Sequence, residues 1–120
     1  GVVKERMDQM KAMRDAMKSL AAMANGKAAF DRAAVGVAAN AIREKSGAAM
    51  MQLFPEGSTQ HPSEALPKIW TDWPGFEFGA KTLEMRTGQL TAAEEPAALK
   101  KALGEVAGVC KDCHNRFRSR

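Results

Sequence analysis

The sequence predicts an all-α protein, in the simplest case an up-down-up-down antiparallel four-helix bundle with a long loop between its second and third helices. Length, composition and periodicity support this prediction. The 120 residues are enough for one domain, taken as residues 1–120. Alanine is abundant at 22 residues, whereas Val, Ile and Thr together number 13 and Tyr is absent, a balance that favours helix over sheet. Apolar residues recur at helical spacing in four segments.

The first helix is predicted over the first 25 residues. Charged residues separate its apolar positions, which form a single stripe: Val3, Met7, Met10, Met17 and Leu20. Asn25-Gly26 follows, and such residues are common where a helix ends. The eight methionines of the chain are interpreted mainly as core residues, because Met adapts to irregular gaps.

The second helix is predicted to begin at Asp31, whose carboxylate can accept hydrogen bonds from the amides of the first turn. Phe30, just before it, can pack against that turn. The inner face is expected to consist of Val35, Ala38, Ala41 and Ile42. The apolar pattern fades after Lys45-Ser46-Gly47.

A long ordered loop is predicted next, because four of the five prolines lie between Leu53 and Pro74. Loops of this length often serve a site. Trp70 and Trp73 are expected to anchor the loop to the bundle, and His61 is expected to be exposed.

The third helix is predicted to begin near Asp72 to Pro74, since proline is tolerated in a first turn. Its expected inner face is Phe76, Ala80, Leu83, Thr87 and Leu90. The fourth begins near Pro96, after two acidic residues that suit the positive end of the helix dipole. Its inner face is expected to be Leu99, Leu103, Val106, Cys110, Cys113 and Phe117.

One motif carries chemistry, and it lies near the end of the fourth predicted helix: Cys110-Lys111-Asp112-Cys113-His114. C-x-x-C-H is the attachment sequence of c-type haem. Cysteines three apart leave one side of a helix, so both sulfurs can reach the vinyl groups of one porphyrin. His114 lies one turn after Cys110 on the same face, where its imidazole can ligate the iron. We therefore expect covalent haem c, one per chain.

Other uses of the two cysteines fit less well. A disulfide between them would close a tiny loop and stabilise little. A thioredoxin-type pair follows a strand, and no strand pattern precedes this one. A zinc site needs four ligands, and only His61 remains as a histidine beyond the motif. A structural bundle with an incidental motif is the remaining alternative.

The chain resembles the cytochrome c′ family, the class II c-type cytochromes, over almost its whole length. The position of the haem motif near the C-terminus is similar to that family, as is the spacing of an arginine, Arg6, four residues before an apolar residue, Met10. Several further stretches resemble family segments in the same order: Gly26–Asp31, Leu53–Ser58, Ala65–Trp70 and the Phe117-Arg118 tail.

The resemblance implies a role for each matching residue of the motif and of the first helix. His114 would be the proximal iron ligand, and Cys110 and Cys113 the thioether anchors. Met10 would lie over the distal face of the haem.

Four other residues are implied to surround the haem. Arg6 would lie near a propionate, and Phe54 would form part of the wall. Arg118 would lie beside the proximal pocket, with Phe117 next to it among the residues that contact the haem.

Two functional classes remain open at this point. In the first, His114 alone holds a five-coordinate iron, which transfers one electron and binds NO or CO. In the second, the Met10 sulfur is the sixth ligand of a low-spin electron carrier. The first is preferred because the better-known members of the resembling family are of that kind.

Partners and location follow from the same observations. Redox partner proteins and small gases are expected. A nucleic-acid partner is not, because the net charge of +4 is spread along the chain. No apolar run approaches the ~20 residues of a membrane span, and no hydrolytic residue set indicates an enzyme. Attachment of haem to an exported chain, and the lack of a signal peptide, indicate a mature periplasmic protein.

The resemblance also implies a homodimer formed through the first two helices. Small residues there would permit close approach: Ala21, Ala22, Ala38 and Ala39.

Overall fold

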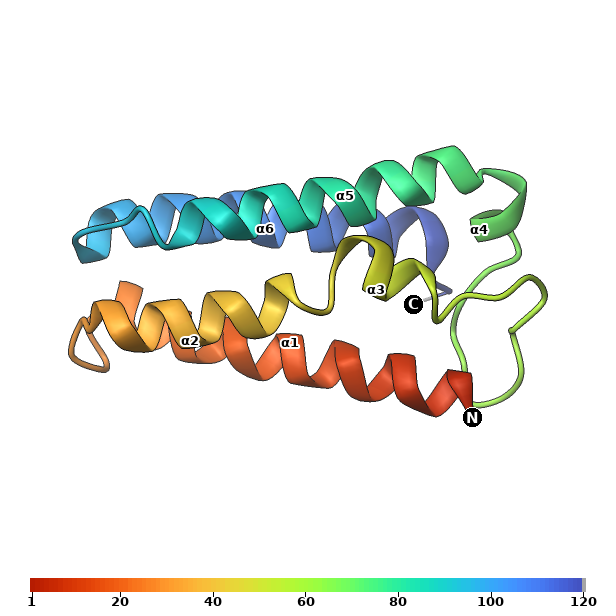
Figure 1. The fold of residues 1–120 in the computed structure, drawn as a ribbon, viewed down its shortest axis with the longest axis horizontal. Coiled ribbons are helices and arrows are strands. Elements are labelled where there is room, and N and C mark those ends of the chain that lie inside the picture. The colour runs from red at the N-terminus through yellow and green to blue at the C-terminus, as the bar shows by residue number, and fades with distance from the viewer. Residues whose placement is uncertain (120) are drawn as a thin grey trace.

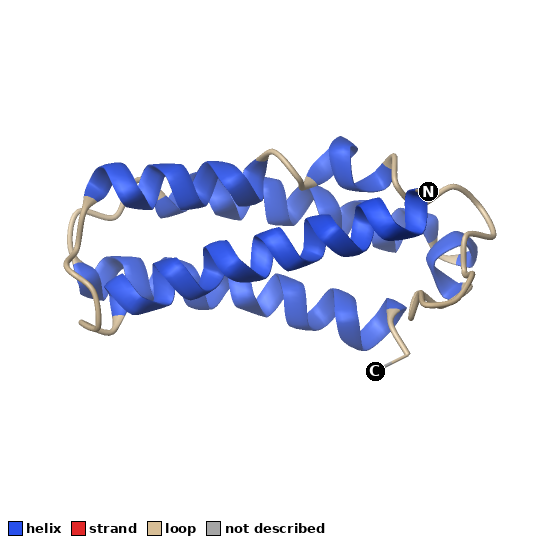
Figure 2. Cartoon of the chain, turned by 90° about the horizontal axis from the view of Figure 1, so that it is seen from below, coloured by secondary structure: helices blue, strands red, loops and turns tan. Residues whose placement is uncertain are grey.

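The computed structural model describes residues 1–119, and it confirms the predicted bundle (Figure 1). The four long helices are α1 (Val2–Ala24), α2 (Arg32–Arg43), α5 (Trp73–Leu90) and α6 (Pro96–Phe117). Each packs against the next, and α6 returns to pack against α1, which closes the ring (Figures 1 and 2). The long axis of the molecule measures 43 Å.

Side-chain caps explain where three of the long helices begin. The Asp31 carboxylate accepts a hydrogen bond from the Ala33 amide at 2.9 Å, as predicted. At the start of α6 the Glu95 carboxylate accepts one from the Ala98 amide at 2.7 Å. Asp72 caps α5 in the same way. These bonds satisfy amides that have no partner within the helix.

Two short helices were not predicted. The first, α3 (Gly47–Met51), follows α2 after a sharp turn at Gly47, where φ is 58°. This left-handed conformation favours glycine. The second, α4 (Lys68–Thr71), lies within the predicted long loop and precedes α5 directly.

The predicted core is correct on α5 and α6, correct on α2 for Val35, Ala38 and Ile42, and wrong for most of α1. All five expected α5 residues are buried, as are the expected residues of α6 apart from the half-buried cysteines. The stripe of α1 is rotated, and its buried residues are Arg6, Met13, Ala16, Leu20 and Met23. On α2, Ala39 is buried in place of Ala41. Two methionines predicted as core residues, Met7 and Met85, are exposed to 43% and 59%.

The loop between α3 and α4 is tied to the bundle at both of its halves. Trp70 acts as the predicted anchor, since its indole N–H donates to the Phe54 carbonyl at 2.9 Å. Further along, the Leu66 amide donates to the Phe117 carbonyl at 2.9 Å, within a short antiparallel bridge between Ala65 and Arg118. The loop therefore lies against the end of α6.

None of the helices in residues 1–119 is both long enough and apolar enough to cross a membrane.

Candidate functional site

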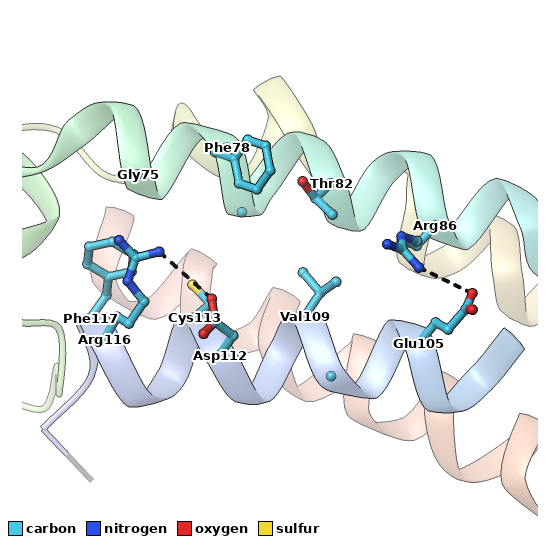
Figure 3. Close-up of a pocket in the computed structure, with 12 residues that line it drawn as sticks. Gly75, Phe78, Thr82, Arg86, Glu105, Val109, Asp112, Cys113, Arg116 and Phe117 are labelled. Carbon is cyan, nitrogen blue, oxygen red and sulfur yellow. Dashed lines mark ion pairs between the residues drawn. The ribbon is translucent and has the colours of Figure 1, made fainter. Parts of the chain in front are cut away.

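The motif residues lie in the last two turns of α6, where the helix fixes their directions. Cys110 and Cys113 are free thiols, half-buried and packed against the core. Cys113 also lines a groove of about 300 Å³ between α5 and α6, whereas Cys110 and His114 do not (Figure 3). Adjacent residues on a helix point about 100° apart, so Cys113 and His114 diverge.

This divergence decides what kind of ligand the three donors fit. Within residues 1–119, no three His, Cys, Asp or Glu side chains are grouped to hold one metal ion. Two thiols on one side of the helix, with an imidazole that points away from Cys113, suit a flat macrocycle, which needs two attachment points on its edge and one ligand at its centre.

Burial shapes the chemistry of these three side chains. It raises the pKa of the Cys110 thiol and, with the nearby Cys110 and Asp112, raises the pKa of the Cys113 thiol to about 11. Burial also lowers the pKa of His114, and the positive charge of Arg118 lowers it further. At neutral pH the imidazole is therefore uncharged, which is the form that binds a metal.

Arg118 lies near His114, because its amide donates to the His114 carbonyl at 3.1 Å and its charge lowers the pKa of the imidazole. Its guanidinium pairs with Glu64 of the loop, with Nη2 2.7 Å from the carboxylate and Nε donating at 2.8 Å. The Ser119 amide donates to the Glu64 carbonyl at 2.8 Å. Glu64 of the loop thus holds Arg118, the residue whose charge lowers the pKa of His114.

Arg6 is buried, with only 4% of its surface exposed, and it faces the first half of the loop. Its Nη1 donates to the Leu53 carbonyl at 3.1 Å and to the Ser58 hydroxyl at 2.6 Å. Its Nη2 donates to the Ser58 carbonyl and to the Ser63 hydroxyl at 2.8 Å. All four acceptors are neutral.

Aromatic rings connect Arg6 to the end of α6. The guanidinium carbon lies 4.4 Å from the centre of the Phe54 ring. That ring meets Phe76 edge-on, with centroids 4.8 Å apart, and Phe76 meets Phe117 at 5.5 Å. Arg6, Phe54 and Phe117 are therefore brought together through Phe76. Phe117 follows His114 by three residues on α6, so this cluster lies near the motif.

Met10 lies one turn after Arg6 on α1, half-buried and packed against the core. Met13, one turn further, is buried, whereas Met7 is exposed. Of the methionines near Arg6, Met10 and Met13 therefore face inward. His61 is exposed, as expected.

Sequence reasoning missed Ser58, Ser63 and Glu64, which hold the two arginines. A serine after a glycine, as at Gly57-Ser58, is ordinary in a turn. Nothing in the sequence marks it as the partner of a residue fifty-two positions away.

A four-helix bundle with C-x-x-C-H in its last helix defines a class, the helical-bundle proteins that carry haem c. Comparison with known proteins agrees. The family described as Cytochrome C′ matches residues 1–118. The chain therefore belongs to the cytochrome c′ family, whose members are electron-carrying c-type haem proteins.

Individual relatives support this assignment. The chain is 38% identical to cytochrome c′ of Rhodopseudomonas palustris, over 99% of this chain and 82% of that protein. It is 32% identical to cytochrome c-556 of Agrobacterium fabrum, over 98% of this chain and 81% of that protein. A solved structure of Rhodopseudomonas palustris cytochrome c′ superposes with a TM-score of 0.91 at 36% identity, covering 99% of this chain and 96% of that one.

Proposed function

We propose that this chain is a monohaem cytochrome c′ in which Cys110 and Cys113 hold haem c by thioether bonds and His114 ligates its iron. The observation that supports this most directly is the presence, within two turns of one helix, of two half-buried thiols on one side and an uncharged imidazole that points away from Cys113. When bound, haem c supplies one-electron chemistry and a site for small gases.

The remaining predicted residues fit the surroundings of that group. Arg6 is a buried cation whose hydrogen-bond partners are all neutral, so its positive charge would attract a haem propionate without competition from a protein carboxylate. Phe54 and Phe117 supply apolar wall between Arg6 and α6. Arg118 favours the neutral form of His114 and so keeps its lone pair available.

We further propose that the iron is five-coordinate, transfers one electron and binds NO or CO. The half-buried thioether of Met10 closes the distal side as packing material. The alternative, in which Met10 ligates the iron in a low-spin electron carrier, rests on the same position of the side chain. In both cases the chain is a carrier rather than an enzyme, and its macromolecular partners are redox proteins.

The proposed setting is the bacterial periplasm, and the proposed assembly is a homodimer through α1 and α2. The small residues first considered for that contact need correction, because Ala38 and Ala39 are buried inside the bundle. Val37, exposed to 74% on α2, is the apolar side chain of that helix that we propose for the contact.

Substitution of the cysteines tests the proposed function. Cys110→Ala, Cys113→Ala, the double variant and Lys111→Ala are produced in a host that attaches haem c, and covalent haem is detected by haem staining on a denaturing gel. Each single variant should lose one thioether, and the double variant should lose covalent haem altogether. Lys111→Ala, within the motif but at a variable position, should retain it. Haem that survives denaturation in the double variant would contradict the proposal.

A further inference from the structure

Arg6 is a buried charge without a counter-charge. None of the acidic side chains in residues 1–119 forms an ion pair with it, although 4% exposure leaves its guanidinium largely out of water. A buried charge is costly unless other groups compensate it. Neutral oxygens of the loop supply that compensation here.

Ser58 contributes two of the four acceptors, and its own hydroxyl has a fixed direction. The hydroxyl donates its hydrogen to the Pro55 carbonyl at 2.7 Å, so toward Arg6 it can only accept. Ser58 is itself buried, with 4% of its surface exposed. The serine therefore holds the guanidinium from both its side chain and its backbone.

The four bonds use all the N–H groups on the two terminal nitrogens of Arg6. A guanidinium has five N–H donors, so the Nε–H is the donor left over. Both terminal nitrogens of the Arg6 guanidinium are thus bound to the loop, and the loop oxygens determine the orientation of the guanidinium. The Ser63 hydroxyl also accepts a hydrogen bond from the Ala65 amide at 3.1 Å. This second bond holds the Ser63 oxygen in place as an acceptor for Arg6.

We propose that Ser58 is a positioning residue that fixes the charge of Arg6 beside the haem and thereby raises the reduction potential of the iron. This inference rests on the proposed function. Reduction of ferric haem removes one positive charge, so a fixed nearby cation favours the ferrous state, most strongly where water is excluded. Without the Ser58 hydroxyl, the guanidinium can turn toward solvent, where its field is screened.

A double-mutant cycle tests the proposal. The haem-loaded proteins are the unchanged chain, Ser58→Ala, Arg6→Met and Ser58→Ala with Arg6→Met, and the reduction potential of each is measured by spectroscopic titration. Arg6→Met should lower the potential, and Ser58→Ala should lower it by less. In the Arg6→Met background Ser58→Ala should produce no further shift, because its effect acts through the arginine. The neighbouring exposed residue provides the control, since Thr59→Ala should leave the potential unchanged.

Two results would overturn the proposal: an unchanged potential in folded Ser58→Ala, or an equal shift with and without Arg6. Circular dichroism melting of every variant separates loss of folding from the shift. If Arg6→Met does not fold, Ser63→Ala combined with Ser58→Ala replaces it, and the pair should lower the potential more than either single variant. An unchanged potential in that pair would also refute the proposal. Failure of the proposed function is seen separately, as absence of covalent haem in the unchanged chain.

Discussion

Asp72 at the start of α5 and Arg116 in the last turn of α6 form an ion pair, with the Arg116 Nη2 3.0 Å from the Asp72 Oδ2. The same aspartate caps α5 by accepting from the Gly75 amide at 3.3 Å. A Cβ at Gly75 would lie 2.9 Å from the Arg116 Nη2, and closer still to the Asp72 carboxylate. Glycine at this position therefore leaves room for the pair that joins the two helices.

Gly75→Ala is expected to destabilise the fold. The added methyl must displace both the cap and the ion pair. Loss of the cap costs about 1 kcal/mol and cancels the gain in helix propensity, so loss of the ion pair makes the net change unfavourable. Gly79→Ala on the same helix is the matched control, because a Cβ there meets nothing within 4 Å, and it should stabilise by about 1 kcal/mol. Urea unfolding of both variants measures the difference, and an equal gain from both would contradict the prediction.

Alkylation of the haem-free chain should reveal the raised pKa of Cys113. A pKa of about 11 leaves on the order of 100-fold less thiolate at pH 8 than an ordinary cysteine has. Iodoacetamide should therefore modify Cys113 slowly at pH 8 and faster as pH rises toward 11. Peptide mass spectrometry follows the rate, with the urea-unfolded chain as control. Equal rates in the folded and unfolded chain at pH 8 would show that burial does not suppress the thiolate.

Met10→Ala distinguishes the two coordination states. With a five-coordinate iron, the ferrous protein already has a high-spin spectrum, and the smaller side chain should speed entry of CO. Met7→Ala is the control, because Met7 faces solvent and should leave both spectrum and rate unchanged. A low-spin ferrous spectrum that becomes high-spin in Met10→Ala would instead establish the sixth ligand. The same change in Met13→Ala alone would assign that role to Met13.

Val37→Asp should dissociate the proposed homodimer. An aspartate at a desolvated apolar contact of α2 leaves a charge without a partner, whereas the same change at exposed Met85 on α5 lies off the proposed interface. Sedimentation at micromolar concentration should show a dimer for the unchanged chain and for Met85→Asp, and a monomer for Val37→Asp. A monomer in all three would refute the dimer.

The sequence sufficed for the elements whose patterns are strong. The α5 and α6 stripes contain Leu, Phe and Val among charged residues, so one face stands out, and the structure buries that face. On α1 the pattern is ambiguous, whereas on α2 only the choice among the alanines failed. Methionine and alanine occur all round α1, so the inward direction could not be chosen between Met7 and Met13. On α2 alanines occur on several sides, so Ala41 was expected to be buried where the structure buries Ala39.

The residues of the candidate site also fall into two groups, those that the sequence could predict and those that it could not. Cys110, Cys113 and His114 were predicted because local spacing on one helix fixes how they lie. The surroundings of Arg6 depend on Ser58, and those of Arg118 on Glu64, which is fifty-four residues away. Such contacts follow from how the loop folds back on the bundle, and a five-residue pattern contains no information about that. The two short helices were missed for a related reason, since a single turn is too short to show a period.

The anchors of the loop between α3 and α4 have an entropic consequence. Ser58 and Ser63 fix the ends of a four-residue exposed stretch, 59–62. Closing a longer segment between two fixed points costs only about 0.6 kcal/mol for each doubling of its length. A peptide tag or recognition sequence placed in 59–62 should therefore be carried as an outward bulge, close to the end of the bundle that contains the C-x-x-C-H motif but without stretching the bonds to Arg6. This stretch is a natural position from which to tether such a cytochrome to an electrode or to a partner.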